Sequence, residues 1–163
     1  MPYFYAINSY IMIYRKAKRE DVPAIVEMLA ADNLGATRED YCDPLPQSYY
    51  TAFEKISSNP IQELIVAEDN DGNLVATLQL TFIQYLTYQG GTRLLVENVR
   101  VRHDKRGQGI GEALFKWVIE RGKTEGAFLI QLTSDFRRVD AIRFYERLGF
   151  KNTHAGMKLL LKQ

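Results

Sequence analysis

The sequence predicts an α/β fold in which a mixed sheet carries helices on both faces. Three observations point to this fold. Short apolar runs typical of strands alternate with segments whose apolar residues recur every three or four positions. The sequence Asn70-Asp71-Gly72-Asn73 joins two of the apolar runs and is a strong hairpin signal. A glycine-rich bend at residues 107–111 joins another apolar run to a long amphipathic helix.

The N-terminal half is expected to contribute three strands and two helices. Its first helix has Pro23 in the first turn, where a missing N–H costs nothing. The same helix places Val22, Ile25, Met28 and Leu29 on one stripe. The expected strands cover residues 11–17, 63–68 and 74–82, and the expected helices cover residues 22–31 and 48–57.

The C-terminal half is expected to contribute four strands and two helices. Apolar residues at helical spacing mark one face of the longer helix: Ile110, Ala113, Leu114, Trp117 and Val118. Gly149 is typical of a helix C-terminal cap and closes the second helix. The expected strands cover residues 92–102, 128–132, 150–151 and 157–161, and the expected helices cover residues 109–123 and 138–148.

Composition and charge exclude several classes of function. The 163 residues suit one domain, which we place at 11–163 with residues 1–10 as an N-terminal extension. A net charge of +1 gives no sign of nucleic acid or an anionic membrane as partner. The single Cys42 cannot form an internal disulfide, which favours a reducing, cytoplasmic location. His103 and His154 are too isolated to indicate a metal site.

The bend at residues 107–111 predicts a site for a phosphorylated ligand. Its three glycines leave backbone N–H groups uncovered where the helix begins, with the positive end of the helix dipole behind them. A Walker A loop is excluded because Gly111 is followed by Glu112 and not by a Lys-Ser or Lys-Thr pair. A dinucleotide fingerprint is excluded because the glycine spacing is G-x-G-x-G and the next apolar run ends in Thr133-Ser134.

The remaining pattern, [RQ]-x-x-G-x-[GA], is filled by Arg106, Gly109 and Gly111. It resembles the acetyl-CoA loop of the GNAT-type N-acetyltransferase family, and residues 140–150 resemble that family's A-x-x-F-Y-x-x-x-G-F segment. The resemblance implies the GNAT fold, with a mostly antiparallel sheet of six to seven strands and about four helices. The tail also resembles aminoalkylphosphonate and related small-amine N-acetyltransferases, although the first helical region does not obviously follow them.

The resemblance implies acetyl-CoA as co-substrate, with its diphosphate on the backbone of the bend. The implied cofactor-binding residues are Val99, Arg100, Val101, Arg106, Gly107, Gln108, Gly109, Ile110, Gly111, Glu112 and Phe144. The N–H groups of Val99 and Val101 would stabilise the oxyanion, and Tyr145 would protonate the leaving thiolate. Glu97 interrupts an apolar run, where a carboxylate is costly to bury, and we assign it as the general base.

The function expected from these residues is acetyl transfer from acetyl-CoA to a primary amine by direct attack in a ternary complex. The acceptor is expected to be a small molecule bound by residues 34–53 and the turn at 84–91. Two alternatives remain open: a non-catalytic acetyl-CoA sensor or regulatory module, and an acetyltransferase acting on protein N-termini or lysines. A homodimer is possible, with residues 157–161 as an edge.

Overall fold

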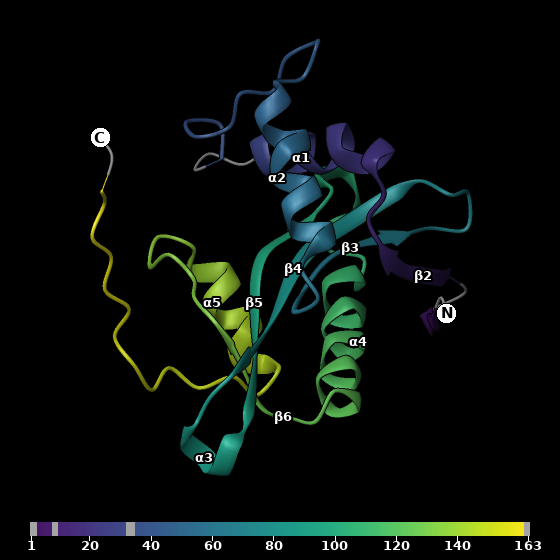
Figure 1. The fold of residues 1–163 in the computed structure, drawn as a ribbon. Coiled ribbons are helices and arrows are strands. Elements are labelled where there is room, and N and C mark those ends of the chain that lie inside the picture. The colour runs from purple at the N-terminus through teal and green to yellow at the C-terminus, as the bar shows by residue number, and fades with distance from the viewer. Residues whose placement is uncertain (1–2, 8–9, 32–34, 162–163) are drawn as a thin grey trace. The chain divides into compact units, whose positions relative to one another are not determined.

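The computed structural model describes residues 3–7, 10–31 and 35–161. The chain divides into two compact units, Met1–Gln131 and Leu132–Gln163. The first unit contains the sheet and the helices α1 to α4, and the second contains α5 (Figure 1). Across the described parts of the chain, no helix is both long and apolar enough to cross a membrane.

The strands follow one another in the sheet in the order of the sequence, β1-β2-β3-β4-β5-β6. Five of them, β1 to β5, form a continuous antiparallel run, and β6 follows β5 in the sheet order. The strands are β1 (Tyr3–Ile7), β2 (Tyr10–Lys16), β3 (Gln62–Glu68), β4 (Leu74–Gln84), β5 (Thr92–Val101) and β6 (Ala127–Leu132).

The helices agree with the sequence prediction to within one residue at each end. They are α1 (Val22–Ala30), α2 (Gln47–Ser58), α4 (Ile110–Thr124) and α5 (Val139–Arg147), with short 3-10 turns η1 (Arg19–Asp21) and η2 (His103–Lys105). The short element α3 (Thr87–Gly90) lies in the turn between β4 and β5, and it is not a regular helix because Tyr88 and Gln89 have left-handed backbone conformations.

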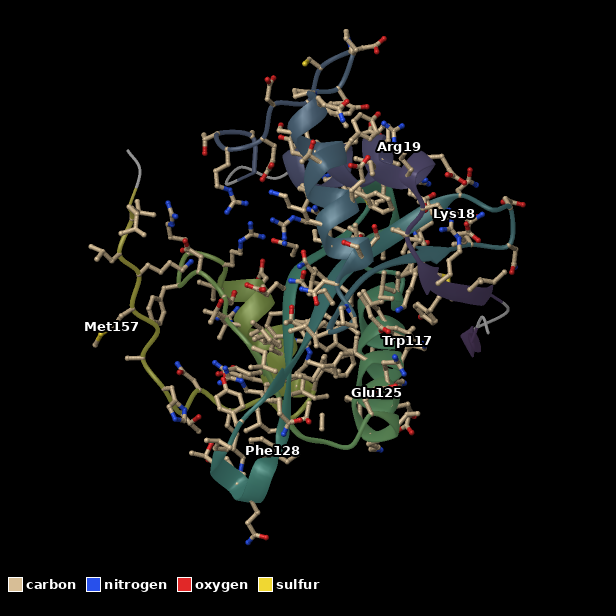
Figure 2. The ribbon with its side chains drawn as sticks, in the orientation of Figure 1. Lys18, Arg19, Trp117, Glu125, Phe128 and Met157 are labelled. Atoms are coloured by element: carbon tan, nitrogen blue, oxygen red, sulfur yellow. The ribbon has the colours of Figure 1, made fainter. Side chains whose placement is uncertain are left out.

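Two helical layers cover opposite faces of the sheet. Trp117 of α4, labelled in Figure 2, stacks on Tyr14 of β2 with ring centroids 5.3 Å apart. Tyr14 therefore faces α4. The next residue, Arg15, points to the other face because side chains alternate along a strand. There its guanidinium binds Asp21, 2.6 Å away, at the residue that precedes α1. α1 therefore begins on the face opposite α4.

Five of the seven predicted strands are confirmed, with ends that agree to within two residues. The two closing strands at 150–151 and 157–161 were predicted wrongly, because the structure has no strand in this segment. A strand needs a neighbouring backbone to pair with, and exposed apolar residues alone do not supply one. The structure pairs five strands in antiparallel register, β1 to β5, where six to seven were predicted, and β6 follows β5 in the sheet order. β1 lies in the segment that was expected to be an extension.

Candidate functional site

The bend between β5 and α4 contains two glycines in the left-handed region. Gly107 has φ +74° and Gly109 has φ +81°, values that residues with a side chain adopt only with strain. Gly109 is the N-cap of α4, and no side chain caps the helix from this position. The two glycines therefore turn the chain sharply and leave the beginning of α4 uncovered.

The first turn of α4 presents backbone donors that have no carbonyl to bind within the helix. The N–H of Ala113 binds the carbonyl of Gly109, 3.1 Å away, so the earlier amides at Ile110, Gly111 and Glu112 precede the first full helical bond. α4 is 15 residues long, and its dipole adds positive potential at this end. The carboxylate of Glu112 is held by Lys116, 2.9 Å away, which reduces its repulsion of an anion. This end of α4 suits a phosphate group.

Side chains of the bend are bound to the strand and turn that precede it. Arg106 Nε donates to the carbonyl of Val101, 3.1 Å away, and Gln108 Nε2 donates to the carbonyl of Asp104, also 3.1 Å away. Arg102 pairs with Asp104 at 2.7 Å, and this pair lowers the pKa of the Asp104 carboxyl. The exposed Arg106 and Gln108 thus stabilise the bend, and Gly107, Gly109 and Glu112 are exposed as well.

A β-bulge in β5 lies within the predicted site. Gln79 pairs with Glu97, whereas Thr77 pairs with Arg100, so two residues of β5 stand opposite one residue of β4. The extra residue adopts a left-handed backbone at Asn98, with φ +54°. Gln79 and Thr77 share a face of β4, so Glu97 and Arg100 share a face too, although three residues separate them. The bulge was not predicted from the sequence, in which an asparagine within an apolar strand is its one signal.

The shared face is the one opposite α4. Leu94 of β5 packs on α4, since a Cβ added at Gly122 would lie 3.2 Å from its side chain. Val96 points the same way and is buried, so Glu97 points to the other face. There Glu97 is exposed. The premise that this carboxylate is buried was therefore wrong, and its candidacy as a base depends on its place beside the bulge.

The remaining predicted residues of β5 are half-buried. Arg100 Nη1 donates to the carbonyl of Val99, 2.8 Å away, so this guanidinium is held against its own strand. Val101 pairs with Ala76 of β4 and accepts the Arg106 bond on its carbonyl. The predicted site residues from Glu97 to Glu112 thus all lie in the first unit. They occupy the end of β5, the turn that follows it and the start of α4.

Phe144 and Tyr145 belong to the second unit, where they lie on α5. Their rings meet edge to face with centroids 5.3 Å apart, and Tyr145 meets Phe150 in the same manner at 6.0 Å. Gly149, with φ +93°, turns the chain between them, as its predicted role as a helix cap requires. The two predicted residues therefore form an aromatic group with Phe150.

The chain is an α/β protein in which a bulged strand leads through a glycine turn to a helix start without a side-chain cap. The model of the Acetyltransferase (GNAT) family matches residues 25–150, and the chain belongs to this family. This match confirms the family predicted from the sequence, whose members are acyltransferase enzymes.

Solved and curated relatives support this assignment. The chain is 50% identical to a transcriptional regulator from Bacillus halodurans C-125, with a TM-score of 0.88, over 92% of this chain and 99% of that one. A predicted acetyltransferase from Clostridium acetobutylicum, solved with acetyl-CoA, is 23% identical with a TM-score of 0.70, over 92% and 96% of the two chains, which shows the shared fold. An aminoalkylphosphonate N-acetyltransferase from Salmonella typhimurium is 39% identical over 59 residues. That match spans 36% of this chain and 38% of that relative.

Proposed function

We propose that the protein transfers an acetyl group from acetyl-CoA to the primary amine of a small molecule by direct attack in a ternary complex. The observation that carries the proposal is the uncovered start of α4 behind two left-handed glycines, directly after a bulged strand. Free amides and a helix dipole fit the diphosphate of coenzyme A. When bound, acetyl-CoA supplies an activated acetyl group as a thioester.

The residues of this chain supply three kinds of assistance to the transfer. Glu97, acting through water, accepts the proton that the amine loses as its nitrogen bonds to the carbonyl carbon. The N–H groups of Val99 and Val101 stabilise the negative charge that develops on the carbonyl oxygen. Tyr145 donates a proton to the thiolate as the carbon–sulfur bond breaks. The acceptor of this proposal is a small polar amine, in keeping with the activity named for the Salmonella typhimurium relative.

The proposal is tested by thiol release from acetyl-CoA in the presence of a panel of amines. The panel contains aminoalkylphosphonates, amino acid analogues, amino sugars, polyamines and short peptides. We expect release with at least one small amine and no release above the rate of hydrolysis in its absence. Turnover of peptides alone would move the assignment to a protein acetyltransferase.

Substitution of Glu97 by glutamine is expected to lower the acetylation rate chiefly at low pH, where free amine is scarce and a base is needed most. Because Glu97 is exposed, the variant should keep the packing of the wild type. Glu120→Gln on α4 is a matched exposed control. The measurement is the pH dependence of kcat/KM. A profile identical to that of the wild type removes Glu97 from the mechanism.

Substitution of Tyr145 by phenylalanine is expected to reduce kcat by about 10²-fold while leaving the affinity for acetyl-CoA nearly intact. Phenylalanine keeps the ring that packs against Phe144 and Phe150 and removes only the hydroxyl. Steady-state kinetics and calorimetric titration with acetyl-CoA measure the two quantities separately. Full turnover in this variant would assign Tyr145 to packing.

A second candidate function is a non-catalytic acetyl-CoA sensor. The observation that favours it is the 50% identity to the transcriptional regulator from Bacillus halodurans C-125. Both predicted catalytic residues, Glu97 and Tyr145, stand in this chain, and binding alone requires neither. Coenzyme A binding without turnover of any amine in the panel would favour the sensor.

A further inference from the structure

Asp69, in the hairpin between β3 and β4, is a buried carboxylate that the proposed mechanism does not use. Its side chain is 5% exposed. Oδ1 accepts the N–H groups of Asp71 and Asn73 at 3.1 and 3.0 Å, together with the amide of the Asn73 side chain at 3.3 Å. One carboxylate oxygen therefore shapes the hairpin turn.

The other carboxylate oxygen is directed at the phosphate bend. Oδ2 of Asp69 accepts a hydrogen bond from the ammonium of Lys105, 3.4 Å away. Lys105 is the last residue of η2 and directly precedes Arg106. The ion pair with Asp69 therefore holds the chain just before the bend at residues 107–111. Burial raises the pKa of Asp69, but the hydrogen bonds from Asn73, Asp71 and Lys105 outweigh burial and lower it, so the carboxylate is charged at neutral pH.

The same hairpin holds the other end of η2. The backbone N–H of Arg102 donates to the carbonyl of Val75 at 2.8 Å, and its Nη1 donates to the carbonyl of Leu74 at 3.1 Å. Arg102 precedes η2 and Lys105 ends it, so the hairpin fixes this turn at both of its ends. The orientation of the bend that follows depends on the turn being fixed.

We propose that Asp69 is a positioning residue for the phosphate bend, acting through Lys105. The inference rests on the proposed function, since it assigns the bend to the diphosphate of coenzyme A. The ammonium of Lys105 is held by the buried carboxylate of Asp69 and so fixes the residue that precedes the bend. In this proposal Lys105 does not bind phosphate itself. Loss of either charge loosens the bend and lowers its affinity for coenzyme A.

The test compares Asp69→Asn and Lys105→Met with the wild type by calorimetric titration with coenzyme A and by steady-state kinetics. Asparagine keeps the oxygen that accepts the turn amides and removes the charge that holds Lys105. We expect each variant to bind coenzyme A about two- to fivefold more weakly, the range for one partly exposed ion pair. The KM for acetyl-CoA should rise by the same factor, with kcat nearly unchanged. Asp71→Asn, in the same turn but exposed, is the matched control and should bind as the wild type does.

Two further measurements separate positioning from direct contact with phosphate. Lys105→Arg should restore most of the affinity, because it keeps a cation opposite Asp69. Amide hydrogen exchange at residues 105–109 of the ligand-free protein should accelerate in Lys105→Met, which a lost ligand contact would not cause. Hydrogen exchange in Lys105→Met tests the positioning role even if Asp69→Asn does not fold.

The possible failures are distinguishable. Wild-type affinity in Asp69→Asn, or tighter binding because Lys105 is released toward the ligand, overturns the positioning role alone. Unchanged hydrogen exchange in Lys105→Met has the same meaning. A wild-type protein that does not bind coenzyme A overturns the proposed function, and the positioning role falls with it.

Discussion

Replacement of Arg121 by methionine is expected to lower the free energy of unfolding by about 3–5 kcal/mol, the range for removing one partner of a buried ion pair. Glu63 of β3 is 5% exposed, and Arg121 of α4 binds it through both carboxylate oxygens, at 2.7 and 3.1 Å. Lys16 also reaches Glu63 at 3.1 Å, but its side chain is 68% exposed and hydrated. Methionine keeps much of the volume of arginine, so the loss reports mainly on the buried Glu63 carboxylate, which keeps the exposed Lys16 as its cation.

The pH dependence identifies the cause of this loss. Burial raises the pKa of Glu63, but hydrogen bonds from Arg121 and Lys16 outweigh burial, and the net shift is downward. The wild-type pair therefore stabilises the fold above the unfolded pKa of about 4.3, and this contribution is lost as pH falls through the lower folded pKa. Without Arg121, Lys16 is left to oppose burial, so the pKa of Glu63 should be higher in the variant than in the wild type. The variant should therefore lose less stability than the wild type as pH falls through these pKa values.

Urea unfolding of both proteins at several pH values measures the effect. The difference between wild type and variant should narrow toward acid pH. Lys123→Met, on the same helix, removes an exposed pair with Glu120 and should cost no more than about 0.5 kcal/mol. A deficit that stays constant with pH would mean that lost packing, and not the Glu63 charge, destabilises the variant.

The parts of the fold that could be predicted from sequence are those with local causes. The helical spacing of Ala113, Leu114, Trp117 and Val118 predicted one apolar face for α4, and all four side chains are buried. Glycine at the N-cap of α4 and glycine after α5 marked helix ends because left-handed backbone favours that residue. Each of these signals depends on only a few residues that are close in sequence, so the sequence alone could predict them.

The parts that could not be predicted depend on pairing between distant segments. The bulge at Asn98 arises from the register between β4 and β5, and it places Arg100 on the same face as Glu97. The ion pair of Asp69 with Lys105 joins residues 36 apart in sequence. The segment at 157–161 has the composition of a strand, yet the structure shows none there, because a strand is defined by its partner as well as by its residues.

Replacement of Gly109 by valine is expected to weaken coenzyme A binding by about tenfold or more. Gly109 has φ +81°, and a Cβ added there would meet no protein atom within 4 Å, so the cost is backbone strain and not a clash inside the protein. A β-branched residue relieves that strain, which is about 1–2 kcal/mol, by leaving the left-handed region. The amides of Gly111 and Glu112 then turn away from the position in which the helix start presents them.

Gly126→Val is the matched control for this variant. Gly126 has φ +69°, also with open space around an added Cβ, and it lies just after the other end of α4. Both variants carry similar strain and should lose similar stability in thermal unfolding. Calorimetric titration with coenzyme A should show weaker binding in Gly109→Val alone. Equal affinities in the two variants would mean that the bend at 107–111 does not hold the diphosphate, and the proposed acetyl transfer would lose the observation that carries it.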